Sequence, residues 1–418
     1  MSAFVYTDGK LGAEGVTLAD VARTYGTPCY VYSRAAIEKQ WTALHNAVGT
    51  HDHLICYAVK ANSSLAILNI LARLGSGFDI VSAGELQRVI KAGGDTRKVV
   101  FSGVGKREDE LEYALDHGIK CFNIESRAEL LRLGKIATRT ENRAAVSLRV
   151  NPDVDVATHP YIATGLKENK FGIPHTEAFA IYEQAISMDY IDITGIDCHI
   201  GSQIMNLDSF MDALDRLAEL IDALEQKGIV LQHIDVGGGL GIRYHDEMPP
   251  SIEEYARVIL EHLGDRKKQL VIEPGRCITG NAGVLLTRVE HLKQTTHKNF
   301  AIVDAAMNDL LRPALYDAWH DILPVDEGES RKGAATYDIV GPVCESGDFL
   351  GRERKLAIDE GDFLAVCSAG AYGFVMSSNY NSRPRVSEVM VDKGEMFEIR
   401  KRETLDDLMH GEVLLPDD

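Results

Sequence analysis

Short apolar runs alternate with helical patterns over most of the chain, and this alternation restricts the fold more than any other feature. Each run has the length of a strand and is too short for the core of a helix. Eight runs are predicted to form strands, namely Leu54–Val59, Phe78–Val81, Val99–Phe101, Cys121–Ile124, Ala144–Val150, Ile193–Ile200, His233–Val236 and Gln269–Glu273. Helical patterns lie near residues 65–74, 84–92, 107–117, 126–138, 176–187, 209–227 and 252–263. This order predicts an α/β fold with a closed (β/α)8 barrel of the TIM type, in place of an open doubly wound sheet.

The pattern changes after Gly275, where short β-like segments follow one another with little helix between them. They are Val284–Leu292, Phe300–Val303, Tyr337–Val340, Phe363–Val366 and Val386–Val391. Gly, Asp and Pro turns separate them, which predicts a second, mainly β domain of the barrel or sandwich kind. The amino-terminal strand Phe4–Tyr6 is assigned to the same domain. The predicted boundaries are residues 30–280 for the barrel and residues 1–29 with 281–418 for the β domain.

The charge balance excludes some kinds of partner. With 44 basic and 63 acidic residues the chain has a formal charge of −19, which disfavours nucleic acid and anionic membrane surfaces. The amino terminus has no basic segment followed by an apolar run, and no stretch approaches a membrane span, so a cytoplasmic location is expected. The seven cysteines are widely spaced without a C-x-x-C pair. Neither a disulfide framework nor a metal site is therefore predicted.

Lys60 follows the apolar run Leu54–Val59 directly, and Asn62, Ser63 and Ser64 then supply residues that begin helices well. The lysine is therefore expected in the loop at the carboxyl end of a buried strand, where α/β folds place their chemistry. Low-dielectric surroundings lower the pKa of an ammonium and make its amine available as a nucleophile or Schiff-base former. The alternative is a lysine that extends from the strand end into solvent.

Two further strand ends carry candidate residues. His199 lies at the end of the sixth run, where a histidine can equally be a buried rim residue. Gly237, Gly238 and Gly239 follow the seventh run, but a dinucleotide fingerprint would need glycine at position 242, which is Ile242. Glycines at this place still let backbone N–H groups approach an anion, and the loops after strands seven and eight are the usual phosphate site of such barrels.

The eighth run ends in Glu273-Pro274-Gly275-Arg276. Glu273 and Arg276 can be a solvated ion pair at the barrel rim. Alternatively, Glu273 binds a cationic ring nitrogen and Arg276 binds a carboxylate or phosphate. A lysine, a phosphate cradle and an acidic ring partner together meet the requirements of pyridoxal phosphate.

Nine motifs carry a resemblance to a known family. They are Tyr57–Asn62, Gly77–Glu85, Phe101–Lys106, Thr164–Gly172, His199–Gln203, Gly237–Gly239, Glu273–Arg276, Cys344–Asp348 and Ala371–Gly373. Their joint spacing resembles that of the diaminopimelate decarboxylases, from about residue 25 to residue 400. The resemblance implies the alanine-racemase-like fold and pyridoxal 5'-phosphate as cofactor. It also implies decarboxylation of meso-2,6-diaminopimelate to L-lysine and carbon dioxide, the last step of lysine biosynthesis.

The resemblance also implies roles for single residues. Lys60 would bond covalently to the cofactor, His199 would stack on its ring, and Cys344 would take part in protonation from the neighbouring subunit of a homodimer with shared active sites. The residues assigned to the cofactor are Lys60, His199, Ser202, Gly239, Glu273, Gly275, Arg276 and Tyr372. Those assigned to the substrate are Arg276, Arg312, Tyr316, Glu345 and Tyr372.

Other activities remain as alternatives at this point. Related decarboxylases act on ornithine, arginine, lysine or carboxynorspermidine. The segment Met307–Tyr316 favours diaminopimelate, because a distal amino-acid head group needs an anion-binding residue such as Arg312, supported by Tyr316. A non-catalytic cofactor carrier would be expected to lack the β domain and to have lost Lys60 or Cys344, and the chain keeps both. Alanine racemase activity is disfavoured because no matching tyrosine motif is found in the second domain.

Overall fold

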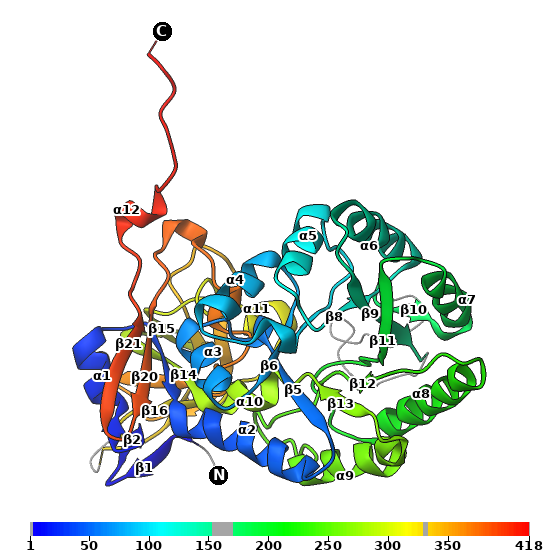
Figure 1. The fold of residues 1–418 in the computed structure, drawn as a ribbon. Helices are drawn as coiled ribbons and strands as arrows, with labels where there is room; N and C mark the ends of the chain where they lie inside the picture. Colours follow the sequence, from blue (N-terminus) through cyan, green and yellow to red (C-terminus); the bar gives the residue numbers. More distant parts are fainter. Residues whose placement is uncertain (1–2, 153–169, 329–332, 418) are drawn as a thin grey trace. The chain divides into compact units, whose positions relative to one another are not determined.

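The computed structural model describes residues 3–152, 170–328 and 333–417 (Figure 1). Its contacts divide the chain into two compact units. The β unit consists of Met1–Ile37, Tyr244–Asp246 and Thr279–Asp418, and the barrel unit of Glu38–Arg243 and Glu247–Ile278. This division differs from the predicted boundaries at residues 30–37, because strand β4 (Cys29–Ser33) pairs with strands of the β unit and not with the barrel. It also places Tyr244–Asp246 in the β unit.

The barrel unit contains the predicted parallel barrel. Its strands are β5 (His53–Ala58), β6 (Gly77–Ile80), β7 (Val99–Phe101), β8 (Cys121–Ile124), β9 (Ala144–Asn151), β11 (Ile191–Asp197), β12 (His233–Asp235) and β13 (Gln269–Ile272). The eight strands close into a ring, since β8 pairs with β9 and the last strand β13 pairs with the first strand β5. The short strand β10 (Ile173–Pro174) extends β9. The TIM-type barrel is therefore confirmed.

Helices lie outside these strands (Figure 1). They are α2 (Arg34–Val48), α3 (Leu65–Arg73), α4 (Ala83–Lys91), α5 (Glu108–Asp116), α6 (Arg127–Thr140), α7 (His175–Ile186), α8 (Asp208–Gln226) and α9 (Ile252–Leu263). The side chains of Ser82, Ser126 and Ser251 accept hydrogen bonds from backbone N–H groups, and they cap the first turns of α4, α6 and α9. Helix α2 was not among the predicted helices. No helix in the described ranges is long and apolar enough to cross a membrane.

The barrel interior changes character along its strands. An apolar cluster consists of Leu54, Cys56, Val100, Cys121 and Val271, from four of the strands. Buried polar residues instead occur near the carboxyl ends of strands, and they include Asp79, Asn123, Asp197 and Asp235. Burying a polar group in a barrel core costs free energy unless the group is paired. The polar carboxyl end of the barrel is therefore the expected location of the functional site.

The β unit is built around the long strand β14 (Gly283–Gln294). Its sheet has the order β18-β17-β15-β14-β4-β20-β21, and β16 and β19 pair with each other beside β14. The other strands are β15 (Asn299–Val303), β16 (Ile322–Pro324), β17 (Ala335–Val340), β18 (Phe349–Leu356), β19 (Phe363–Val366), β20 (Ser387–Asp392) and β21 (Glu395–Arg400). A second, mainly β part of the chain is thus confirmed.

The amino-terminal segment forms a small sheet of its own within the β unit. This sheet contains β1 (Val5–Thr7), β2 (Lys10–Ala13) and β3 (Val16–Thr17), and helix α1 (Leu18–Tyr25) follows it. Its apolar side chains belong to the same core cluster as residues of β14 and β20, such as Leu11 with Leu286 and Val389. The predicted amino-terminal strand therefore contributes to the core of the β unit without joining its large sheet.

Candidate active site

Lys60 lies in a short 3-10 turn (Val59–Ala61) directly after β5. Its Nζ atom is 2.6 Å from Oδ2 of Asp79, at the end of β6, and the Asp79 side chain is fully buried while that of Lys60 is 37% exposed. The lysine is therefore held at the barrel end by a buried carboxylate and does not simply extend into solvent. Asp79 was not predicted as a partner of Lys60, although a charged residue between Phe78 and Ile80 in an otherwise apolar run indicates a buried ionic contact.

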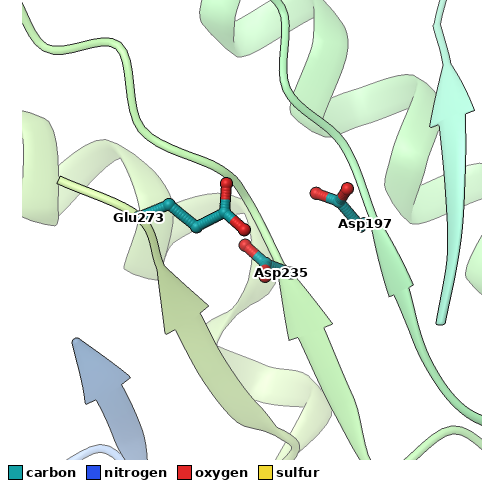
Figure 2. Close-up of side chains that lie close together, drawn as sticks. All are labelled: Asp197, Asp235 and Glu273. Atoms are coloured by element: carbon teal, nitrogen blue, oxygen red, sulfur yellow. The ribbon is translucent and has the colours of Figure 1, made fainter. Parts of the chain in front are cut away.

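Three carboxylates converge at the same end of the barrel (Figure 2). Asp197 ends β11, Asp235 ends β12 and Glu273 directly follows β13, so three neighbouring parallel strands bring them to one level. All three are buried, and one oxygen from each lies within 4.8 Å of the others. Only Glu273 was predicted as a site residue, and the solvated ion pair considered for it is wrong because it is 6% exposed.

Burial and mutual repulsion raise the pKa values of these carboxylates. Burial is the main cause for Asp235, whose pKa rises to about 6. Burial and then the neighbouring Asp235 raise the pKa of Glu273 well above its usual range. Burial, followed by Asp235, does the same to the pKa of Asp197, opposed by the guanidinium of Arg149. Carboxylates this close cannot all be ionised without a compensating positive charge or a shared proton.

Hydrogen bonds satisfy only part of this cluster. Glu273 Oε1 accepts long bonds of 3.4 Å from Ser102 Oγ and Asn123 Nδ2, and Asp235 Oδ1 accepts the Gly237 N–H at 2.9 Å. Within the described residues, Asp197 Oδ1 and Asp235 Oδ2 are buried and have no hydrogen-bond partner. The cluster therefore has more acceptors than donors, which suits a cationic or proton-bearing group from a ligand.

His199 lies two residues beyond the end of β11, and its Nδ1 atom accepts the Gly238 N–H at 3.2 Å. Since Nδ1 is an acceptor, the neutral ring carries its proton on Nε2. Burial, helped by Arg149 and Lys60, lowers the pKa of His199 well below its usual value. The imidazole is thus neutral and flat, as a ring that stacks on an aromatic ligand should be.

Glycines let the loop after β12 pass close to its neighbours. A Cβ atom at Gly238 would lie 2.0 Å from the Glu273 carbonyl oxygen, and one at Gly239 would lie 2.3 Å from the Gly201 carbonyl oxygen. Gly237 and Gly239 also have φ values of +65° and +101°, which glycine adopts without strain. The loop therefore presents bare backbone next to the segments that carry His199 and Glu273.

The remaining cofactor candidates of the barrel unit lie beside this loop. Arg276 Nη2 donates to Ser202 Oγ at 2.9 Å, which connects the segments after β11 and β13. Gly275 is close to the turn that carries Lys60, since a Cβ atom there would lie 3.0 Å from the Ala61 Cβ. The structure thus brings together all the barrel residues that the sequence assigned to the site.

These residues fit pyridoxal phosphate. Lys60 offers an amine for the aldehyde, Glu273 and its neighbours offer negative charge for a ring nitrogen, and the glycine loop with Ser202 and Arg276 offers donors for a phosphate. The buried oxygens of Asp197 and Asp235 that lack hydrogen-bond partners explain why the cluster would favour a protonated ring nitrogen. A metal ion would compete for the same carboxylates, but Lys60 and the glycine loop have no part in such a site.

The candidates of the β unit lie in three segments. Arg312 begins the short helix α11 (Arg312–Tyr316) and is 7% exposed, while Tyr316 ends that helix and is half-buried. Cys344 and Glu345 are exposed in the turn between β17 and β18, where the Cys344 N–H donates to Asn381 Oδ1 at 2.8 Å. Tyr372 follows β19 with a φ of +55°, a left-handed conformation that is strained for a bulky residue.

Comparison with known proteins decides the family. The model of the pyridoxal-dependent decarboxylases, pyridoxal binding domain, matches residues 34–280. The diaminopimelate decarboxylase of Pseudomonas aeruginosa is 59% identical over 416 residues, which is 100% of both chains. The chain belongs to the diaminopimelate decarboxylase family. The Vibrio cholerae member is 60% identical over 98% of both chains. The crystal structure of the M. jannaschii diaminopimelate decarboxylase in complex with L-lysine has a TM-score of 0.94, with 35% identity, covering 99% of this chain and 98% of that one.

Family membership makes this chain a pyridoxal-phosphate-dependent carboxy-lyase. One of its motifs, Thr164–Gly172, lies partly outside the described residues, which resume at Lys170. The part that is described contacts the site's ionic network. Gly172 N–H donates to Glu125 Oε2 at 2.9 Å, and Glu125 Oε1 accepts from Arg149 Nη1 at 2.8 Å. Arg149 was not among the predicted site residues, although it lies within the apolar run Ala144–Val150.

Proposed function

We propose that the chain removes carbon dioxide from meso-2,6-diaminopimelate and forms L-lysine, with pyridoxal phosphate bound at the carboxyl end of the barrel. The observation that carries this proposal is the 59% identity to a diaminopimelate decarboxylase over the whole of both chains. The geometry of the barrel end supports it, because Lys60 and the acidic cluster occupy the places that such a cofactor requires. The proposal includes a cytoplasmic location, which cell fractionation would test.

In this proposal the barrel residues bind and orient the cofactor. When bound, pyridoxal phosphate supplies an electron sink for the electron pair that remains at Cα after carbon dioxide leaves. Lys60 would hold it through a covalent bond, and Asp79 positions the lysine amine. Glu273, with Asp235 and Asp197, would supply the negative charge that favours a protonated ring nitrogen. His199 would offer a neutral imidazole for stacking on the ring.

The remaining cofactor contacts are assigned to Ser202, Gly239, Gly275, Arg276 and Tyr372. We assign the substrate contacts to Arg276, Arg312, Tyr316, Glu345 and Tyr372. Cys344 delivers a proton to Cα, since a thiol is a side-chain group that can donate a proton to a carbanion. Because its turn is exposed and far along the chain from the barrel motifs, we assign Cys344 and Glu345 to the active site of the second subunit in a homodimer.

The proposed substrate is tested by carbon dioxide release from meso-diaminopimelate, ornithine, arginine, lysine and carboxynorspermidine under identical conditions. We expect meso-diaminopimelate to have the highest kcat/KM by at least about two orders of magnitude, because binding sites with buried polar groups reject substrates that leave those groups unpaired. A higher kcat/KM for any of the other amines would contradict the proposal. Family membership would stand in either case.

Arg312→Lys is expected to raise the KM for meso-diaminopimelate by about tenfold or more with a smaller change in kcat. Lysine offers a point charge where a planar guanidinium can make two parallel bonds, and one charge-assisted contact at a buried site contributes about 1.5–3 kcal/mol. Arg352→Lys is a matched control, because Arg352 lies on β18 with an exposed side chain that pairs with Asp317. An unchanged KM in Arg312→Lys and Arg312→Ala would exclude the assigned role.

A further inference from the structure

His320 is a fully buried histidine in the β unit, between α11 and β16, and no site motif of the sequence includes it. Both of its ring nitrogens have partners. Nε2 is 3.0 Å from Nη1 of Arg312, and Nδ1 is 2.7 Å from the backbone carbonyl oxygen of Cys367. His320 therefore connects the arginine assigned to the substrate with the end of strand β19.

The two partners fix the protonation state of this ring. A guanidinium has only donors, so His320 Nε2 must be the acceptor in the contact with Arg312. A backbone carbonyl has only an acceptor, so Nδ1 must carry the proton that it donates to Cys367. The structure therefore requires the neutral imidazole with its proton on Nδ1. A doubly protonated ring would point an N–H at another N–H and lose the contact.

A second residue holds Arg312 from a different direction. The guanidinium carbon lies 4.5 Å from the centre of the Tyr244 ring, and the Tyr244 and His320 rings meet edge to face at 5.2 Å. Stacking on Tyr244 restrains the plane of the guanidinium, and the bond to His320 restrains its rotation within that plane. Together the two contacts preorganise the arginine for a carboxylate, which reduces the entropy lost on binding.

The surroundings make a positive charge on His320 unfavourable. Besides Arg312, a second guanidinium is close, because Arg354 Nη2 donates to the His320 backbone carbonyl at 3.0 Å. Burial lowers the pKa of Arg354 to about 10, and Asp321 opposes this effect. Titratable groups nearby include Tyr244, whose ring meets that of His320, and His245, 3.2 Å from Asp321 Oδ1. They also include the Cys367 thiol, whose pKa burial raises to about 12. Asp321 is the acidic group among these neighbours, and it acts on Arg354.

We propose that His320 is a positioning residue for Arg312, and that protonation of His320 weakens binding of the substrate's distal carboxylate. The neutral ring accepts from the guanidinium and keeps it stacked on Tyr244. The protonated ring has no acceptor for Arg312 and repels it. This inference rests on the proposed role of Arg312, and it adds a residue that sets both the affinity for the head group and its dependence on pH.

Two ligands that differ by one carboxylate provide the test. L-Lysine has the distal amino-acid head group, and 1,5-diaminopentane is the same molecule without the carboxylate. Their dissociation constants are measured by calorimetry on the holoenzyme between about pH 8.5 and about pH 5.5, the range in which histidines titrate. The ratio of the two constants cancels effects of pH on the cofactor and on amine binding. The advantage of L-lysine is the factor by which it binds more tightly than 1,5-diaminopentane. We expect this factor to be constant at and above neutral pH and to fall only toward the acid end of the range, because burial and the two guanidinium groups oppose protonation of His320. The full loss of the contact would reduce it by about tenfold.

Variants separate His320 from its neighbours. His320→Gln keeps an acceptor near the position of Nε2 and cannot be protonated, so the advantage of L-lysine should stay near its value at high pH across the whole range. His320→Leu lacks the acceptor, so the advantage should be reduced by about tenfold at every pH. The matched control His245→Gln removes a neighbouring imidazole that contacts Trp319 and Asp321, and it should keep the dependence of the wild type.

The outcomes distinguish this inference from the function on which it rests. If Arg312→Ala leaves the advantage of L-lysine unchanged, the assigned role of Arg312 is wrong. If Arg312→Ala removes that advantage while His320→Leu keeps it, His320 does not position the arginine. A pH dependence that persists in His320→Gln, or disappears in His245→Gln, would assign the titration to another group and overturn the inference.

Discussion

Lys60→Ala is expected to reduce decarboxylase activity by about a thousandfold or more, because a covalently positioned reactant is worth several orders of magnitude in rate. The substitution removes the amine that bonds to the cofactor, and it leaves the buried Asp79 without its cation at 2.6 Å. Purified wild-type protein should be yellow, and the variant should lose the absorbance of the bound cofactor. Steady-state assays and visible spectra of the two proteins measure both effects.

Reduction with borohydride identifies the lysine directly. It should fix the pyridoxyl mass on the peptide that contains Lys60. Lys106 is the informative competitor, because it follows β7 in the same barrel, is buried, and donates to Glu129 Oε1 at 2.6 Å. Label on Lys106 would refute the assignment. Lys98→Ala is a matched control. The Lys98 ammonium donates an exposed hydrogen bond to the Gly75 carbonyl oxygen, so the substitution should leave activity unchanged.

Mixing inactive Lys60→Ala and Cys344→Ala proteins is expected to restore about a quarter of wild-type activity if the active site is shared in a two-fold dimer. Random re-association makes half of the dimers mixed, and each mixed dimer has one intact site and one site with both defects. In a site formed within one subunit, every subunit keeps a defect and mixing restores nothing. Activity against the ratio of the two variants measures the difference.

Two controls make this result interpretable. Each variant alone must be nearly inactive, and subunit exchange must be demonstrated, for example with subunits that carry different tags. If exchange is complete and activity does not return, the shared-site proposal fails. The assignment of Lys60 to the cofactor would be unaffected, because the barrel unit contains that part of the site by itself.

The sequence by itself determined the barrel and the places of several candidate site residues. Parallel strands buried on both faces appear as apolar runs, so their ends can be located from composition alone. Lys60, His199 and Glu273 each lie at or directly after the end of such a run, and the structure places all three at the carboxyl end of the barrel. The glycines after β12 were likewise visible, because close backbone approach excludes side chains there.

Tertiary structure decided which polar residues meet. Asp79, Asp197 and Asp235 are local features of three strands, and only the order and register of the closed barrel put Asp79 beside Lys60 and the other two beside Glu273. The acidic character of the site, with its raised pKa values, therefore follows from strand pairing and burial, which no local pattern contains.

Long-range pairing also decided what belongs to the β unit. β4 precedes the barrel in the sequence, but it pairs with β14 and β20, which follow the barrel. The local sequence therefore indicated that this segment is a strand, but it did not indicate which strands it pairs with. Tyr244 similarly lies within the predicted barrel range, yet its ring packs on Arg312 and His320. Sequence determined where strands and reactive side chains occur, whereas contacts between residues distant in the chain determined the protonation and orientation of those side chains.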